Sequence, residues 1–257
     1  MQWLVALSEA RASRLSEHLY LEPPQRVIYI FLRCDRPPFS DRRLRLAFAH
    51  ATDRRTLVRT GAVYTIPADG GFVPPPIPAH SPHIGVPFDP EQARRLLAEA
   101  GFSNGKGLGP FSLLVPPVGE DALYRVITQT WKEILGVEVA ITISRGFDYL
   151  RVIHENPPTI GRLAWLADAP DPDNFLRVVF HSTARSPTRW RNARFDALVE
   201  EAQASTDHRG RMALYHEADR LLVAEEAAII PLVYARTMTL VHPYVRGWWS
   251  TLLGQAP

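Results

Sequence analysis

Residues 111–166 read FSLLVPPVGEDALYRVITQTWKEILGVEVAITISRGFDYLRVIHENPPTIGRLAWL, and this stretch decides the fold class. It contains three short apolar runs with the composition of buried strands, at 111–115, 137–143 and 160–166. Helices are predicted between them, at 120–135 and 146–155. Leu123, Ile127, Trp131 and Ile134 form one apolar stripe along the first helix. This alternation of strands and helices predicts an α/β layer with parallel strand pairing.

Capping residues predict further helices upstream of this stretch. Asp89-Pro90 places an N-cap residue before a proline at the first helical position, and Gly101 ends that helix. Two shorter helices are predicted before it, from Ser40 or Asp41 through Ala51 and from Thr52 or Asp53 to Gly61. A short amphipathic helix is also predicted over residues 1–20, and Pro23-Pro24 is expected to end it.

The remaining segments complete a strand-and-helix pattern. The apolar run 27–32 predicts a buried strand, and the proline-rich segment 62–88 predicts a long ordered loop. The last third is more helical, with helices at 195–204 and 209–226 followed by β-prone segments at 229–234 and 237–241.

Composition narrows the class of function. The chain has 257 residues, of which 46% are hydrophobic, and a formal net charge of +2, so a cored globular protein is expected. Its arginines are dispersed among 27 acidic residues without a basic block, which favours a solvated surface over nucleic-acid binding. Cys34 is the only cysteine, which excludes an intrachain disulfide and a multi-cysteine metal site. No apolar run reaches the length of a transmembrane helix.

Several short stretches, taken in order along the chain, resemble a single family. They are RPPFSDRRLRLAFAHATDR (36–54), FDPEQARRLLAEAGF (88–102), AWLADAPDPDNFL (164–176), and a last group of NARFDAL (192–198), RMALY (211–215) and IPLVY (230–234). Their pattern is similar to that of the peptide and nickel solute-binding proteins of ABC transporters, the oligopeptide- and dipeptide-binding group. One departure is Phe31-Leu32-Arg33, where the family usually has Gly-Phe-Asn.

The resemblance implies a periplasmic-binding-protein-like lobe, in which helices flank a mixed sheet, with hinge strands and a fragment of the other lobe. Residues 1–34 would be a remnant of the first lobe with one hinge strand, and residues 35–228 the second, ligand-binding lobe. Residues 229–257 would be the return hinge strand and the first-lobe tail. A complete family member has about this much chain again on the N-terminal side. The first residues also lack a signal-peptide pattern, so the chain is expected to be truncated, split or mis-started, or else cytoplasmic.

The resemblance also implies which residues bind ligand. Asp168 occupies the position that grips a peptide amino terminus, Trp165 would form a flat wall of the cleft, and Arg162 could pair with a ligand carboxylate. Tyr234 at the end of a returning strand and Arg33 on the other crossing strand are weaker candidates. The strands 27–33 and 229–235 are the candidate hinge.

Each candidate has a structural alternative. Asp168 could cap a helix that begins near Asp171 or Asp173, Trp165 could be a core aromatic, and Arg162 an ordinary surface arginine. Tyr234 could serve the hinge or the core. In a regular strand Arg162 and Asp168 would share one face and Trp165 would lie on the other, unless the chain bends before Pro170.

No catalytic machinery is expected, so the chain is predicted not to be an enzyme. His80 and His83 lie close together without a third ligand at convincing spacing, and no metal site or cofactor is predicted. Asp168, Asp171 and Asp173 could imitate a hydrolase pair or a calcium loop, but the prolines at 170 and 172 disfavour a calcium loop.

Three functional hypotheses remain at the level of sequence. The first is an extracytoplasmic solute-binding component of an ABC importer, periplasmic or at the cell surface, which binds a short peptide-like solute. Its partners would be the permease subunits and the missing N-terminal lobe. The second is a cytoplasmic ligand-sensing domain of a transcriptional regulator, although no helix-turn-helix pattern is visible. The third is a remnant that no longer binds, because both lobes are needed to desolvate a ligand.

Overall fold

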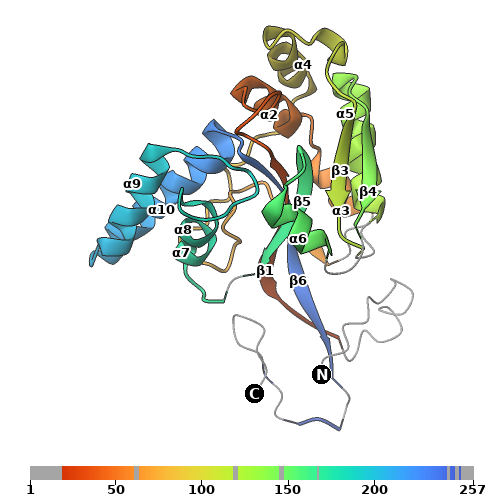
Figure 1. Ribbon diagram of the computed structural model, residues 1–257. Helices are drawn as coiled ribbons and strands as arrows, with labels where there is room; N and C mark the ends of the chain where they lie inside the picture. The colour runs from red at the N-terminus through yellow and green to blue at the C-terminus, as the bar shows by residue number, and fades with distance from the viewer. Residues whose placement is uncertain are drawn as a thin grey trace.

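One six-stranded mixed sheet organises the chain. The computed structural model describes residues 19–60, 64–117, 121–144, 148–166, 168–241, 244–246 and 249. The strands lie in the order β2-β6-β1-β5-β3-β4. Their bounds are β1 (Leu19–Leu32), β2 (Thr65–Pro67), β3 (Phe111–Val115), β4 (Val139–Ile143), β5 (Ile160–Leu166) and β6 (Ile229–Leu240). The predicted mixed sheet flanked by helices is confirmed (Figure 1).

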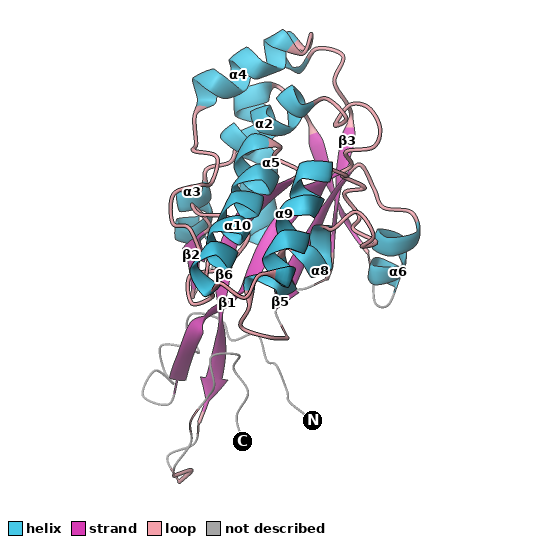
Figure 2. Cartoon of the chain, turned by 90° about the vertical axis from the view of Figure 1, so that its left-hand side faces the viewer, coloured by secondary structure: helices cyan, strands magenta, loops and turns pink. Residues whose placement is uncertain are grey.

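Helices cover both faces of this sheet. One group contributes to the first core: α2 (Arg42–His50), α3 (Arg54–Thr60), α4 (Pro90–Glu99) and α5 (Asp121–Leu135). The other group contributes to the second core: α6 (Asp148–Glu155), α7 (Pro172–Phe175), α8 (Arg177–Phe180), α9 (Ala193–Ala204) and α10 (His208–Arg220). A 3₁₀ turn lies at Ser103–Gly105, and α10 continues into a π-helical turn at Leu221–Glu225. Figure 2 shows the helices packed around the sheet.

Strand β1 separates the two cores by the alternation of its side chains. Ile28, Ile30 and Leu32 lie in the first core. Val27, Tyr29 and Phe31 lie in the second core. Alternate side chains of a strand point to opposite faces, so a continuous apolar run is what a strand buried on both faces requires.

The expectation of parallel pairing is correct for only part of the sheet. Strand β3 pairs in parallel with β4 and β5, as the βαβ connections through α5 and α6 require. The pairs β1–β5, β1–β6 and β2–β6 are antiparallel. The β1–β6 pair joins segments that are far apart in the sequence. The local alternation of strands and helices therefore does not predict it.

Two predicted element boundaries are wrong. Pro23-Pro24 does not end a helix, because β1 runs from Leu19 through both prolines, with register irregularities on either side of Pro24. The segments 229–234 and 237–241 are not separate, since β6 is continuous from Ile229 to Leu240. Most of the helix predicted over residues 1–20 lies outside the described residues.

The two longest strands extend beyond the helical body. Leu19 pairs with Leu240 and Phe31 with Ile229, so β1 and β6 form a ribbon whose outer end carries the start of β1 and the end of β6. Figure 2 shows this ribbon projecting below the helices. Tyr20 and Leu21, near its outer end, are about half exposed.

Candidate functional site

The carboxyl ends of three strands meet at the end of the body where the ribbon leaves. Strands β3, β4 and β5 are parallel, so Val115, Ile143 and Leu166 lie toward the same end. Ligands of open α/β sheets bind outside the carboxyl ends of the strands. Asp168 follows the last residue of β5 by two positions, and its side chain is exposed. This end of the sheet is the candidate site.

Strand β5 has an open edge at this end. It pairs with β1 along all seven of its residues, from Ile160 to Leu166, but with β3 only through Ile160 and Gly161. Strand β3 ends at Val115 and is followed by Pro116-Pro117. Among the described residues, no strand pairs with the β3-facing side of Leu163–Leu166.

The direction of the main-chain groups on this edge follows from a neighbouring contact. The hydroxyl of Tyr149 donates to the carbonyl of Arg162. Along β5, the N–H and C=O groups of one residue point toward β1, and those of the next residue point away from it. The Arg162 carbonyl, which bonds to Tyr149, points away from β1. The amides and carbonyls of Ala164 and Leu166 therefore face the open side.

Asp168 lies in a turn between β5 and α7. Its backbone N–H donates to Oδ1 of Asn174 at 3.1 Å. No hydrogen bond or ion pair of the Asp168 carboxylate is found within the described part of the chain. Asp171 is the N-cap residue of α7 and accepts from the Asp173 N–H, so the capping role considered for Asp168 belongs to Asp171.

The other two carboxylates of the cluster have partners. Asp171 receives two hydrogen bonds from the Arg211 guanidinium, at 2.7 and 2.8 Å. Asp173 accepts from the Tyr215 hydroxyl at 2.8 Å and from Arg177 at 2.8 and 3.0 Å. Burial alone would raise the pKa of Asp171, but the Arg211 bond and the Asp173 N–H outweigh it and hold that pKa below its usual range. The turn therefore presents one uncompensated carboxylate, that of Asp168.

Arg162 and Trp165 lie on opposite faces of β5, as strand alternation predicts. Arg162 is opposite Ile30 and is 7% exposed, so it is not an ordinary surface arginine. Trp165 is opposite Val27 and is half-buried against the second core. Its indole Nε1 is buried without a hydrogen-bond partner among the described residues. The three residues 162, 165 and 168 therefore do not share one surface.

The side chains of the two weaker candidates are already engaged within the protein. Tyr234 is buried, and its hydroxyl donates to the carbonyl of Gly71 at 2.6 Å, so it belongs to the core. Arg33 follows the other end of β1, where its guanidinium donates to Asp35 at 2.7 Å and to the Pro157 carbonyl at 2.7 Å.

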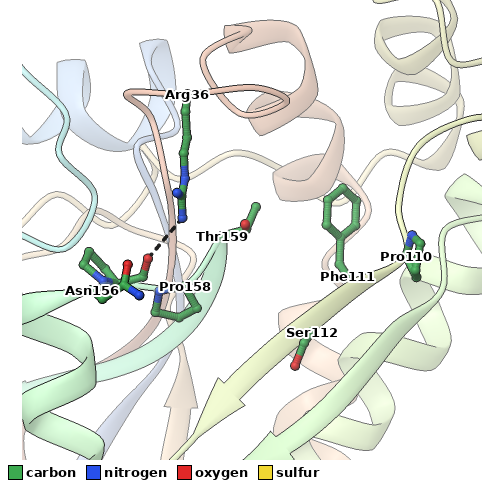
Figure 3. A pocket seen from close by; sticks show the side chains of 8 residues that line it. Arg36, Pro110, Phe111, Ser112, Asn156, Pro158 and Thr159 are labelled. Carbon is green, nitrogen blue, oxygen red and sulfur yellow. Dashed lines mark hydrogen bonds between the residues drawn. The ribbon is translucent and has the colours of Figure 1, made fainter.

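A pocket of about 370 Å³ lies at the opposite end of the sheet (Figure 3). It is formed where the amino-terminal ends of β3 and β5 diverge, and its lining residues are Arg36, Pro110, Phe111, Ser112, Asn156, Pro157, Pro158 and Thr159. The Arg36 guanidinium donates to the Pro157 carbonyl at 3.4 Å. The seven residues of β5, about 20 Å of strand, separate this pocket from Asp168, so it is not part of the candidate site.

Residues that hold the turn were not found from the sequence. Arg211 and Tyr215 lie about 40 positions beyond the aspartates that they bind, and no spacing rule connects such distant residues. Asn174 lies inside the motif that carries Asp168, but its role becomes visible only in the folded turn.

In the described part of the chain, no group of three or more His, Cys, Asp or Glu side chains is arranged to hold a metal ion. None of the helices described is both long enough and apolar enough to cross a membrane.

Comparison with known sequences identifies the family. A profile described as "Bacterial extracellular solute-binding proteins, family 5 Middle" matches residues 5–187, which is more than half of the chain. The chain belongs to the family 5 solute-binding proteins. The family resemblance predicted from the motifs is thereby confirmed.

Relatives within family 5 extend the comparison over nearly the whole chain. Heme-binding protein A of Haemophilus influenzae is 30% identical over 240 residues, which are 89% of this chain and 43% of that protein. The periplasmic oligopeptide-binding protein OppA of Escherichia coli is 26% identical over 251 residues, 95% of this chain and 46% of that protein. The chain thus spans about half the length of the curated relatives it matches.

Solved structures of family 5 proteins have the same fold. A dipeptide-binding protein from Pseudoalteromonas sp. SM9913, in complex with Met-Leu, is 26% identical and superposes with a TM-score of 0.85. The match covers 97% of this chain and 51% of that one. HbpA2 from Haemophilus parasuis superposes with a TM-score of 0.83 at 23% identity, over 98% of this chain and 52% of that one. These superpositions confirm the predicted fold, a mixed sheet flanked by helices like that of periplasmic binding proteins, over about half of each of those chains.

Proposed function

We propose that this chain supplies one lobe of a solute-binding protein that holds a short peptide for an ABC importer. The observation that carries the proposal is the open edge of β5, which leads directly to the unpaired carboxylate of Asp168. An extended peptide can add a strand to an exposed sheet edge through its main-chain groups. Such an edge suits many peptides, because every peptide has the same main chain.

The peptide would run antiparallel to β5. Its ammonium group would lie at Asp168, beyond the carboxyl end of the strand. Its main chain would form hydrogen bonds with the amides and carbonyls of Leu166 and Ala164. A charge-assisted bond from an ammonium to a carboxylate is stronger than a bond between neutral groups. Arg162 lies six positions before Asp168, about 20 Å of strand, so only a peptide of about six residues would bring its carboxylate to Arg162.

We further propose that a second lobe closes over this site. In this account residues 35–228 form one lobe, and residues 1–34 and 229–257 contribute hinge strands and a small part of the other. The projecting ribbon of β1 and β6 supports the division. The relatives, about twice as long, are consistent with it. A cleft between two lobes would not appear as an enclosed pocket in one lobe alone.

The named relatives favour transport over regulation and catalysis. OppA of E. coli is a periplasmic oligopeptide-binding protein, and the Pseudoalteromonas structure holds a dipeptide. We therefore propose a periplasmic or cell-surface location and permease subunits as partners. The regulator alternative gains no support from these relatives. The neighbouring acids Asp171 and Asp173 are held by Arg211, Tyr215 and Arg177, and no hydrogen bond joins them to the Asp168 carboxylate among the described residues.

Calorimetry tests this proposal. In the protein assembled with the lobe that closes the cleft, and with trialanine as the probe, we expect Asp168→Ala to weaken binding by about 2–5 kcal/mol, since it removes one partner of a charge pair that closure desolvates. Glu99→Gln is the matched control, because Glu99 is an exposed carboxylate at the end of α4, and its affinity should equal that of the unmodified chain. Equal affinities for the Asp168→Ala variant and the control would refute the proposed site.

A further inference from the structure

The turn that carries Asp168 is short and depends on contacts from outside itself. Its backbone bonds are few: the N–H of Asp171 donates to Ala169 at 2.8 Å, and the N–H of Asn174 donates to Asp171 at 3.1 Å. Neither bond involves Asp168. Residues 168–170 are exposed, so core packing does not fix their position.

Asn174 makes the bond that fixes Asp168. Its Oδ1 accepts the Asp168 N–H across six residues, from the first turn of α7 back to the end of β5. The main chain of Asp168 is thereby held at a defined distance from α7. Because an aspartate side chain has only two rotatable bonds, a fixed main chain leaves its carboxylate a small range of positions.

Helix α7 is itself anchored on α10. The bidentate pair of Arg211 with Asp171 and the hydroxyl of Tyr215 on Asp173 tie its first turn to α10. Phe175 is fully buried and packs edge-on to Phe72, with ring centroids 5.9 Å apart. Asn174 therefore extends from a rigid support.

We propose that Asn174 is a positioning residue, which holds the Asp168 carboxylate where a ligand ammonium binds. This inference rests on the proposed function, because it assigns a role within the same site. Asn174 touches no ligand in this account and acts only through the Asp168 main chain. The proposal therefore concerns the preference for a free amino terminus, not the affinity for peptide as a whole.

The test compares trialanine with N-acetyl-trialanine, which lacks the ammonium group. The ratio of the two affinities measures the contribution of the ammonium. Asn174→Ala is expected to lower this ratio about five- to tenfold, the loss of roughly one hydrogen bond, while the affinity for the acetylated peptide stays unchanged. Asn174→Asp keeps an acceptor oxygen and should recover most of the ratio.

Asn192→Ala is the control for a purely structural asparagine. Asn192 caps α9 by accepting from the N–H groups of Arg194 and Phe195, so its loss should lower stability and leave the ratio unchanged. A ratio that is the same in Asn174→Ala as in the unmodified chain would overturn the inference. If the unmodified chain shows no preference for the free amine, the proposed function itself fails, and the positioning role fails with it.

Amide exchange gives a second measurement that needs no ligand. The Asp168 N–H should exchange with solvent at least several-fold faster in Asn174→Ala than in the unmodified chain, and at a nearly unchanged rate in Asn174→Asp. An unchanged exchange rate in Asn174→Ala would show that Asn174 does not hold the turn, even where the free-amine preference of the unmodified chain is confirmed.

Discussion

Asp219 is a buried acid that stabilises a loop through main-chain contacts. It lies on α10 with no exposed surface and accepts from the N–H groups of Phe72 at 2.7 Å and Val73 at 3.2 Å. Burial raises its pKa to about 7, although these two bonds oppose the shift. Gly71 is required beside it, because a Cβ there would lie 2.0 Å from Oδ2 of Asp219.

This raised pKa predicts a pH dependence of stability. Between about pH 4 and pH 7 the folded protein keeps a proton that the unfolded chain has lost, so the free energy of unfolding falls as pH rises through this range. The loss is at most about 4 kcal/mol, at 1.36 kcal/mol per pKa unit, and this group adds nothing more above pH 7. Asp219→Asn should remove that part of the slope.

Urea unfolding at pH 5 and at pH 8 measures the effect. The difference in free energy of unfolding between the two pH values should be smaller in Asp219→Asn than in the unmodified chain. If the free energy of unfolding changes equally between the two pH values in both proteins, Asp219 is already ionised at pH 5 in the folded protein.

At the scale of residues, the family motif predicts Asp168 as a ligand contact, and this stays a prediction. Among the described residues its carboxylate has no hydrogen-bond partner. The motif did not distinguish Asp168 from Asp171 and Asp173, whose partners lie on α10 and α8. The strand pattern predicts that Arg33 follows β1, but it does not predict that its guanidinium is held by Asp35 and the Pro157 carbonyl.

At the scale of elements, Gly161 shows how tightly β5 packs against β1. A Cβ on Gly161 would lie 2.4 Å from Cε1 and Cζ of Phe31, the residue opposite it on β1. Gly161→Ala should therefore lower the free energy of unfolding by about 1–3 kcal/mol, through overpacking.

A double-mutant cycle checks this explanation. Phe31→Leu removes the ring atoms that obstruct the new methyl group, so Gly161→Ala should cost less in that background than alone. Equal costs in both backgrounds, measured by urea unfolding, would show that the strain has another source.

Local signals predicted most elements, and their failures have physical reasons. Asp89 accepts from the N–H groups of Glu91 and Gln92, as its capping signature predicts, and β3 and β5 have their predicted bounds. Helices α7 and α8 have four residues each, too few for a helical period to appear. Pro23-Pro24 predicts the end of a helix, but prolines are also tolerated at irregular positions of a strand, and here they lie beside register shifts in β1.

At the scale of the whole molecule, the sheet joins a helical body to a projecting ribbon. The order β2-β6-β1-β5-β3-β4 pairs β1 with β6 across some two hundred residues, and this pairing creates the candidate hinge. Among the described residues, it also leaves the carboxyl end of β5 with β1 on one side and no paired strand on the other. The alternation of strands and helices predicted the α/β class, but this order depends on distant pairing that the local pattern does not encode.

The most direct test of the account is a crystal structure of the protein, together with the lobe that closes the cleft, grown with trialanine. We expect the peptide as an added antiparallel strand, with main-chain hydrogen bonds to Ala164 and Leu166 and its ammonium within hydrogen-bond distance of the Asp168 carboxylate. A peptide bound in the pocket beside Arg36, or bound with its ammonium away from Asp168, would contradict the account.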